Sequence, residues 1–228
     1  MTFGHYFDIQ SVMTIQLSRK QRERLERQTS ILDAAEKLFE SVGYEKTTIE
    51  DIAHRTELAK GTIYLYFSSK EEIIIGLIDR GLQQLDENFE AINANTVSGL
   101  QAYQLMSTEF VKLIHRHPDY TKMFSLYNSL HVEEAIAHRD SEAKLAIANH
   151  KNRLVELMAL AIDRGIKDGS VRADVDATKT ALLTALTAAS FVHPKTATLK
   201  SHSEVCAITP ENLLQYLFEL LNQAIKAE

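Results

Sequence analysis

Cysteine is almost absent from this 228-residue chain, and long apolar runs are absent altogether. Cys206 has no second cysteine to pair with, which excludes an intramolecular disulfide and a cysteine-based zinc cluster, and we expect a buried, unreactive thiol. No run approaches the roughly 18 apolar residues of a membrane span, and no basic segment leads into an apolar one near the N-terminus. These absences predict a cytoplasmic protein without a membrane partner.

The sequence also lacks the groups of side chains that catalysis or metal binding requires. An enzyme needs a nucleophile, a base and an oxyanion-stabilising group that converge, or a metal constellation, and the sequence shows neither. His131, Glu134 and His138 have the spacing of one helical face, as metal ligands often do. The segment around them is polar, so a solvated helix surface accounts for them. We expect no enzyme, no metal and no cofactor.

Helical periodicity is what the chain has in quantity. The composition, 45% hydrophobic and 25% charged residues, is that of an ordinary globular protein with a substantial core. No alternating strand pattern occurs, and Gly, Pro and polar breaks separate runs with apolar residues at helical spacing. The sequence therefore predicts an all-α fold. In its C-terminal part the predicted helices are residues 70–93, 98–116, 119–130, 141–167, 176–192 and 210–226.

Ahead of these helices the sequence has the signals of two more. Apolar side chains at helical spacing end at Gly43, a typical helix stop. Thr47 and Thr48 then stand three residues before two acidic residues, which is the capping-box arrangement that opens a second, short helix. A tight turn follows it. The apolar positions of the two helices are Ile31, Ala34, Ala35, Leu38, Phe39, Val42, Ile49, Ile52 and Ala53.

Residues 59–67, which read AKGTIYLYF, form the most informative segment. On a helix, Ala59, Ile63 and Phe67 share one side and are expected to enter the core. The opposite side presents hydrogen-bond donors around Gly61, where a partner can approach closely and donors can reach phosphates and base edges. A helix of this kind after a tight turn predicts a helix-turn-helix that enters the DNA major groove. The donor side chains are Lys60, Thr62, Tyr64 and Tyr66.

This part of the chain resembles the tetracycline-repressor (TetR) family of bacterial transcription regulators. The resemblance extends from about Ile31 to Ile73 and is specific, because several short motifs occur together in order. It implies a helix-turn-helix DNA-binding domain at residues 18–75, after a tail of residues 1–17 with no assigned fold, and a helical ligand-binding and dimerisation domain at residues 76–228. The motifs are Gly43-Tyr44, Thr47-Thr48-Ile49, Asp51-Ile52-Ala53, Lys60-Gly61-Thr62-Ile63-Tyr64, Tyr66-Phe67 and Lys70-Glu71-Glu72.

Two positions depart from the family pattern. Glu57 occupies a turn position that usually carries Gly, and we expect it in a left-handed conformation that costs roughly 1 kcal/mol. Ala59 replaces the usual Ser at the start of the third helix and cannot cap it with a side-chain oxygen. The resemblance implies base contacts from Lys60, Gly61 and Thr62. The phosphate contacts that it implies come from Thr48, Tyr64, Tyr66 and Lys70.

Two features of the predicted DNA-binding domain leave alternatives open. Tyr64 and Tyr66 either contact phosphates or pack against neighbouring helices. A basic cluster ahead of the first apolar stripe either reaches the DNA backbone or an adjacent minor groove, or forms a solvated helical extension. The net charge of −6 argues against sequence-independent coating of nucleic acid, because such binding depends on neutralising many phosphates. The cluster consists of Arg19, Lys20, Arg22, Arg24 and Arg27.

The last two predicted helices have apolar surfaces suited to a second subunit. The first is rich in alanine, which allows close approach, and the second begins with Pro210 after a Thr209 cap and has a broad apolar stripe. Paired with symmetry mates, these helices predict a four-helix homodimer interface. The alternative is burial within one chain. The predicted interface residues are Ala181, Ala185, Ala189, Leu213, Leu217, Leu220 and Leu221.

Between these two parts of the chain lie aromatic and methionine side chains at helical spacing. Such side chains are typical of a plain core as well as of a pocket, and it is the family resemblance that implies a pocket. Their apolar character implies a small hydrophobic or aromatic effector. The candidate lining residues are Phe89, Tyr103, Met106, Phe110, Met123, Phe124, Tyr127, Met158 and Phe191.

The resemblance therefore implies a transcriptional repressor that binds a palindromic double-stranded DNA operator as a homodimer and is released by the effector. The fourth helix carries Lys70 of the DNA-binding unit and Phe89 of the pocket, so we expect it to link the two sites. The sequence does not choose among a drug, a fatty-acyl compound and a metabolite as effector. The alternative is an organiser protein of the same fold that binds DNA without an effector, and a closed, dry interior would favour it.

Overall fold

The computed structural model describes residues 18–116, 141–191 and 209–227. Within these ranges the chain is helical, apart from loops and one isolated antiparallel bridge between Val171 and Lys226, and the predicted all-α class is confirmed. None of the helices in these ranges is both long and apolar enough to cross a membrane. The following predicted features lie outside the described residues: the tail 1–17, the helix 119–130, Met123, Phe124, Tyr127, His131, Glu134, His138 and Cys206.

The helices have bounds close to those predicted. The last five predicted helices that the structure describes begin and end within two residues of their expected positions. In chain order the helices are α1 (Arg19–Val42), α2 (Ile49–Arg55), α3 (Lys60–Tyr64), α4 (Lys70–Asn95), α5 (Gly99–Arg116), α8 (Ser141–Asp168), α9 (Ala177–Phe191) and α11 (Pro210–Ile225).

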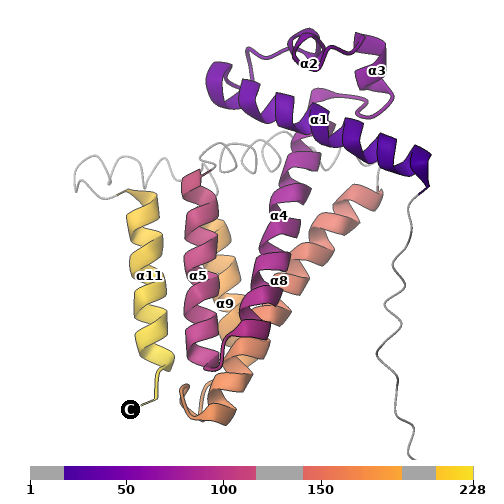
Figure 1. The fold of residues 1–228 in the computed structure, drawn as a ribbon. Coiled ribbons are helices and arrows are strands. Elements are labelled where there is room, and N and C mark those ends of the chain that lie inside the picture. Colours follow the sequence, from indigo (N-terminus) through magenta and orange to yellow (C-terminus); the bar gives the residue numbers. More distant parts are fainter. Residues whose placement is uncertain (1–17, 117–140, 192–208, 228) are drawn as a thin grey trace, which may run out of the picture.

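Two groups of helices share α4. Figure 1 shows α1, α2 and α3 as a small unit at the top, from which α4 descends into a bundle with α5, α8, α9 and α11. In this bundle α8 packs against α4, α5 and α9, and α11 packs against α5 and α9. The N-terminal half of α4 also packs against α1. One helix therefore belongs to both groups.

The buried core is continuous across this shared helix. Ile73, Leu77 and Ile78 of α4 are fully buried and join the core of the small unit to that of the bundle. Burial of such apolar side chains is the main favourable term in folding. The predicted boundary between residues 75 and 76 falls inside α4, so the division into domains at that point stays a prediction.

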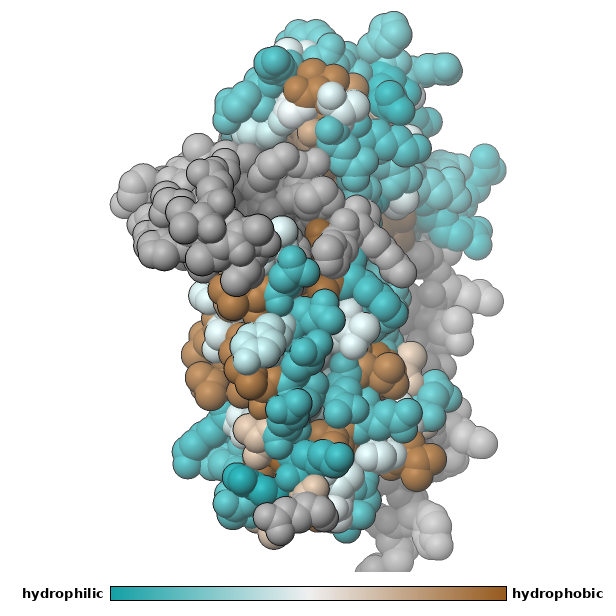
Figure 2. All heavy atoms as spheres, turned by 90° about the vertical axis from the view of Figure 1, so that its left-hand side faces the viewer, coloured by the Kyte–Doolittle hydropathy of each residue, from teal (hydrophilic) through white to brown (hydrophobic). Residues whose placement is uncertain are grey.

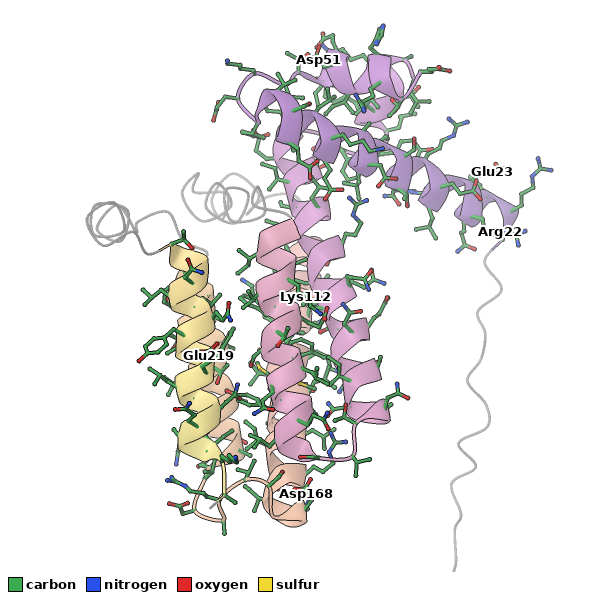
Figure 3. The ribbon with its side chains drawn as sticks, turned by 60° about the vertical axis from the view of Figure 1, so that its left-hand side comes forward. Arg22, Glu23, Asp51, Lys112, Asp168 and Glu219 are labelled. Atoms are coloured by element: carbon green, nitrogen blue, oxygen red, sulfur yellow. The ribbon has the colours of Figure 1, made fainter. Side chains whose placement is uncertain are left out.

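Helices α5 and α8 pack closely against each other at the end of the bundle that lies away from the small unit. A Cβ atom added at Gly99 would lie 2.0 Å from the backbone nitrogen of Gly165, so no larger residue fits there without a backbone shift. Asp168, labelled at this end in Figure 3, accepts a hydrogen bond of 2.7 Å from the Gly99 amide. The amide of Arg172 donates to the carbonyl of Ile225 at 2.9 Å, which secures the C-terminus of α11.

Candidate functional site

The second helix begins with the capping box that the sequence predicts. Thr48 accepts a hydrogen bond from the Asp51 amide, while the Thr48 amide and hydroxyl donate to the Asp51 carboxylate at 2.8 and 2.7 Å. These bonds lower the pKa of Asp51. Thr47 is buried instead and donates to the Gly43 carbonyl at 2.8 Å. The capping role therefore belongs to Thr48, which remains exposed at the start of α2.

The turn between α2 and α3 has the strained conformation expected at Glu57. Its φ is 55°, in the left-handed region that favours glycine. The amide of Leu58 closes the turn by donating to the Ala53 carbonyl at 3.0 Å. Ala59 is the N-cap of α3 and makes no side-chain cap, as its methyl group predicts.

The third helix is shorter than its sequence pattern suggests. Regular α-helix covers Lys60–Tyr64, and the chain then passes through a turn to Phe67. Ile63 and Phe67 are buried as expected, but Ala59 is exposed, so the prediction that it enters the core is wrong. The reason is that Ala59 has an extended backbone at the N-cap, outside the helix, where helical spacing does not apply.

The outward surface of α3 is open. Nothing lies within 4 Å of the position where Gly61 would carry a Cβ atom, and Lys60 and Tyr64 are exposed on either side along the helix. Thr62 is half-buried. Leu65, which the predicted site omits, is 76% exposed. The sequence signal that could have identified Leu65 is its position on the helix side opposite Ile63 and Phe67.

Lys60 forms an ion pair with Glu50 of α2. The hydrogen bond from Lys60 lowers the pKa of Glu50, and the same bond raises the pKa of Lys60. Both side chains are largely exposed, so solvent screens their attraction. An incoming acceptor can therefore compete with Glu50 for the ammonium group.

Lys70 has a different environment from the one its predicted phosphate contact assumes. Its Nζ donates to the backbone carbonyls of Tyr44 and Thr47 at 2.7 and 3.0 Å and lies 4.0 Å from the centre of the Tyr44 ring. An ammonium group has three donors, so these bonds occupy two of them. Lys70 thus secures the α1–α2 connection from the start of α4, and its contact with phosphate stays a prediction.

The two tyrosines of the motif also differ from one another. Tyr64 is 46% exposed, whereas Tyr66 is half-buried and packs against the core of the small unit. Of the two alternatives for Tyr66, phosphate contact or packing against neighbouring helices, the structure of the single chain shows partial packing. Tyr64 has the accessibility that a phosphate contact needs.

The basic residues before the apolar stripe of α1 lie on exposed helix. Arg19, Arg22 and Arg27 are all exposed, and the helix begins at Arg19 behind a Ser18 capping box. Figure 3 shows Arg22 and Glu23 near the N-terminal end of α1, beyond the α2–α3 pair. The basic segment is therefore a solvated helical extension in the structure of the protein alone.

The start of α4 is fastened to α1 by charged groups. Arg80 of α4 donates to Asp33 at 2.5 Å and to Glu36 at 2.7 Å, both on α1. The Tyr44 hydroxyl donates to Glu71 at 2.9 Å, and burial together with this carboxylate raises the pKa of Tyr44. These contacts fix the first turns of α4 relative to the helix-turn-helix.

Below these contacts, α4, α5, α8, α9 and α11 enclose a cavity of about 350 Å³. This volume is at the lower end of the range for small-molecule sites, which is roughly 300–1,000 Å³. Four of the predicted lining residues contribute to its wall: Phe89, Met106, Phe110 and Met158.

Two other predicted pocket residues lie outside this wall. Tyr103 is fully buried next to the cavity, and its hydroxyl lies 2.6 Å from the hydroxyl of Thr184, which does line it. Phe191 packs instead against the small apolar cluster that contains Leu214 and Phe218. Sequence reasoning missed the polar members of the wall, which are Ser107, Lys151, Asn152 and Thr184.

The half of α4 that lines the cavity is tied to α8 by polar contacts. The guanidinium of Arg164 donates to the Asn93 carbonyl at 2.7 Å, and Arg153 donates to Glu90 at 2.8 Å. His150 forms a hydrogen bond with Asp86, whose pKa burial raises. Through these contacts α4 and α8 form one wall of the cavity.

Helices α9 and α11 present apolar side chains outward. Leu183, Tyr216 and Leu220 are 57%, 57% and 45% exposed, although all three are large hydrophobic residues. Figure 2 shows hydrophobic residues gathered along the bundle beside a hydrophilic strip. Ala181 is fully buried within the chain, so its place in the predicted interface has to be withdrawn: it lies on the inward side of α9.

The other predicted interface residues lie at or near this surface. Leu220 is exposed, Ala189 is exposed at the rim of the cavity, and Ala185 is half-buried there. The half-buried leucines of α11 pack partly against their own chain. They are Leu213, Leu217 and Leu221.

Together these features define a helix-turn-helix protein in which the outward surface of α3 is open. The model of the family described as "Bacterial regulatory proteins, tetR family" matches residues 31–77. The HTH-type transcriptional regulator YfiR of Bacillus subtilis is 41% identical over 68 residues, 28% of this chain and 33% of YfiR. The HTH-type transcriptional repressor KstR2 of Rhodococcus jostii is 29% identical over 158 residues, 66% of this chain and 70% of KstR2.

The chain thus spans a third of the first of these relatives and somewhat more than two thirds of the second. Solved structures match it over more of its length. A TetR/AcrR-family regulator from Thermobifida fusca has a TM-score of 0.65 and 22% identity, covering 86% of this chain and 97% of that one. FadR from Bacillus subtilis, solved in complex with stearoyl-CoA, has a TM-score of 0.56 and 20% identity, covering 86% and 98%.

Residues 31–77 match the TetR family, as the sequence motifs predict, and the fold of the described residues is that of TetR-family structures. The N-terminal unit of the chain is the family's helix-turn-helix DNA-binding domain. The relatives and solved structures that the chain matches are transcriptional regulators, in agreement with the expectation that the chain is not an enzyme.

Replacement of Lys70 by methionine should lower the free energy of unfolding by roughly 1–3 kcal/mol, because the Tyr44 and Thr47 carbonyls lose a charged donor. Urea unfolding followed by circular dichroism measures this change. Lys46→Met is the matched control, since Lys46 is an exposed lysine of the same loop. An unfolding free energy equal to that of the control would contradict the structural role.

Proposed function

We propose that this regulator is a repressor that binds an inverted-repeat DNA operator as a homodimer and leaves it when a small hydrophobic or aromatic effector enters the cavity. The observation that carries the DNA-binding part is the open surface of α3, where a Cβ atom added at Gly61 would meet nothing within 4 Å beyond its own helix. KstR2, a repressor similar to this chain over 158 residues, supports repression over activation.

In the proposed complex α3 lies in the major groove. Lys60, Gly61 and Thr62 face base edges, and the exposed Leu65 supplies an apolar contact of the kind that thymine methyl groups accept. Lys60 has to exchange Glu50 for the DNA, which costs little because both side chains are largely solvated. The proposed phosphate contacts are Thr48, Tyr64, Tyr66 and Lys70.

Two of these phosphate contacts are constrained by the geometry. Thr48 already donates its hydroxyl proton to Asp51, so it would have to turn that proton outward to bind phosphate. Lys70 has one donor beyond the two bonds to carbonyls. The exposed arginines at the start of α1 add positive charge to the proposed DNA-binding unit.

The proposed dimer uses the outward apolar faces of α9 and α11. Exposed leucine and tyrosine side chains on two adjacent helices form the kind of surface that a partner covers. A twofold axis beside these helices would bring four of them together. It would also place the two α3 helices on successive major grooves, roughly 34–36 Å apart or a multiple of that distance.

The cavity supports an effector. Its walls come from α4 as well as from α5, α8 and α9, and α4 also carries the charged contacts to α1. FadR, which shares this fold, was solved with stearoyl-CoA, so the fold accommodates a ligand with a long apolar chain. An open volume of about 350 Å³ also disfavours the alternative of an effector-independent organiser, which would have a closed interior.

Replacement of Gly61 by alanine should leave the fold intact and weaken DNA binding by about tenfold or more. The added methyl group meets no atom outside its own helix, and alanine is the better helix former by roughly 0.5–1 kcal/mol. The same methyl group would stand between α3 and the DNA. Fluorescence anisotropy measures the affinity for the duplex that the protein enriches from a random pool, and that duplex should be an inverted repeat.

The control for this variant is its thermal unfolding temperature, which should equal or exceed that of the unaltered protein. A scrambled duplex supplies the baseline for sequence-independent binding. Full affinity of Gly61→Ala for the enriched duplex would show that α3 does not approach DNA at this position.

Leu183→Asp combined with Leu220→Asp should convert a dimer into a folded monomer. Both leucines are exposed in the single chain, so the charges would not disturb its interior, but in the proposed interface each charge would be buried without a partner. Analytical ultracentrifugation gives the mass, and circular dichroism reports the fold. Leu145→Asp is the control, because Leu145 is an exposed leucine of α8 and so lies on neither helix of the proposed interface. A double variant that remains dimeric would place the interface elsewhere.

A further inference from the structure

The inner wall of the cavity has no hydrogen-bond donor to offer a ligand among its described residues. The hydroxyl of Ser107 donates to the Tyr103 carbonyl at 3.0 Å. The hydroxyl of Thr184 donates to the Thr180 carbonyl at 2.7 Å and accepts from the Tyr103 hydroxyl at 2.6 Å. These protons are already engaged, so the deep part of the cavity presents an apolar surface to whatever enters it.

The polar side chains of α8 have a different position. Lys151 and Asn152 line the cavity and are also exposed to solvent, which places them at its opening. Lys151 is the charged member among the described lining residues. It takes part in an interaction within the chain, so an incoming anion would exchange one partner for another. A cation at the rim of an apolar cavity is the arrangement that suits an amphipathic ligand.

We propose that the effector is an amphipathic anion, with an apolar chain inside the cavity and a carboxylate on the ammonium group of Lys151 at its opening. This inference rests on the proposed role of the cavity as the effector site. The apolar chain of the ligand lies among Phe89, Met106 and Phe218, which come from three different helices. The carboxamide of Asn152, adjacent on α8, is the second donor for the head group.

The environment of Lys151 favours an anion over a neutral head group. Lys151 is exposed as a residue, but protein atoms around its ammonium displace part of the surrounding water, and this lowers its pKa. A carboxylate at hydrogen-bond distance restores that lost stabilisation, and charge-assisted hydrogen bonds are about twice as strong as neutral ones. An alcohol of the same chain length gains the apolar contacts alone.

The size of the cavity limits the length of the ligand's apolar chain. A volume of about 350 Å³ is small for a ligand site and admits one medium-length chain without a bulky group beside it. Decanoate and the alcohol of the same chain length, decanol, are therefore matched probes: they share the apolar part and differ in the head group.

Isothermal titration calorimetry with the full chain compares decanoate and decanol on the unaltered protein, Lys151→Met and Lys151→Arg. Lys151→Met should weaken decanoate binding roughly 10- to 100-fold, the loss expected for one charge-assisted hydrogen bond, and leave decanol binding unchanged. Lys151→Arg should retain most of the affinity for decanoate. Lys167→Met, at an exposed lysine near the far end of α8, is the control for loss of a surface charge.

The possible failures are distinguishable. Equal effects of Lys151→Met on both probes, or no effect on decanoate, would overturn the anion site while binding of decanol still supported a hydrophobic effector cavity. Binding of neither probe to any of the four proteins would overturn the effector cavity together with the inference. Lys151 is exposed, so its variants should unfold at the temperature of the unaltered protein, and thermal unfolding verifies this.

Discussion

The guanidinium of Arg80 between the carboxylates of Asp33 and Glu36 fixes α4 against the DNA-binding unit. These groups are partly shielded from water, with Glu36 the most enclosed of the three, so screening weakens their attraction less than it would at an open surface. The Tyr44–Glu71 bond and the Lys70 bonds to loop carbonyls reinforce the same joint. The orientation of α2 and α3 relative to the bundle depends on this joint.

The other half of α4 is part of the cavity wall. Leu82, Leu85 and Phe89 face the cavity, and the contacts of Asn93 and Glu90 with α8 hold that half in place. Helices in a close-packed interior move as units rather than deforming continuously. In the proposed mechanism a ligand that changes the spacing between α4 and α8 therefore tilts the helix-turn-helix as well. The ligand shifts the population of DNA-competent molecules by as much as it distinguishes the two arrangements.

Local chemistry made much of this architecture predictable. The capping box at Thr48, the left-handed Glu57 and the uncapped Ala59 follow from the residue types alone, because each depends on bonds within a few residues. The helix bounds were predictable for the same reason: Gly, Pro and cap residues mark them. Motifs in residues 31–73 predicted the family because they combine these local signals in one order.

What sequence reasoning missed depends on tertiary contacts. Lys70 meets two carbonyls because α4 passes beneath the α1–α2 loop, and no local pattern encodes that approach. Helix α9 is apolar on several sides, so its sequence does not distinguish the inward Ala181 from the outward Leu183. Lys151 lies on the same wall as Met158, but an apolar pattern at helical spacing does not mark a lysine as a lining residue.

The central claim is that α4 couples the cavity to the DNA-binding unit, and the most direct test is the affinity for decanoate with and without bound operator duplex. The affinity of the free protein for decanoate, divided by that of the duplex-bound protein, should exceed one, and by linkage this ratio should equal the factor by which decanoate weakens DNA binding. In Arg80→Met, which removes the ion pairs between α4 and α1, the ratio should fall toward one while each ligand still binds alone. A ratio of one in the unaltered protein, or an undiminished ratio in Arg80→Met, would contradict the account.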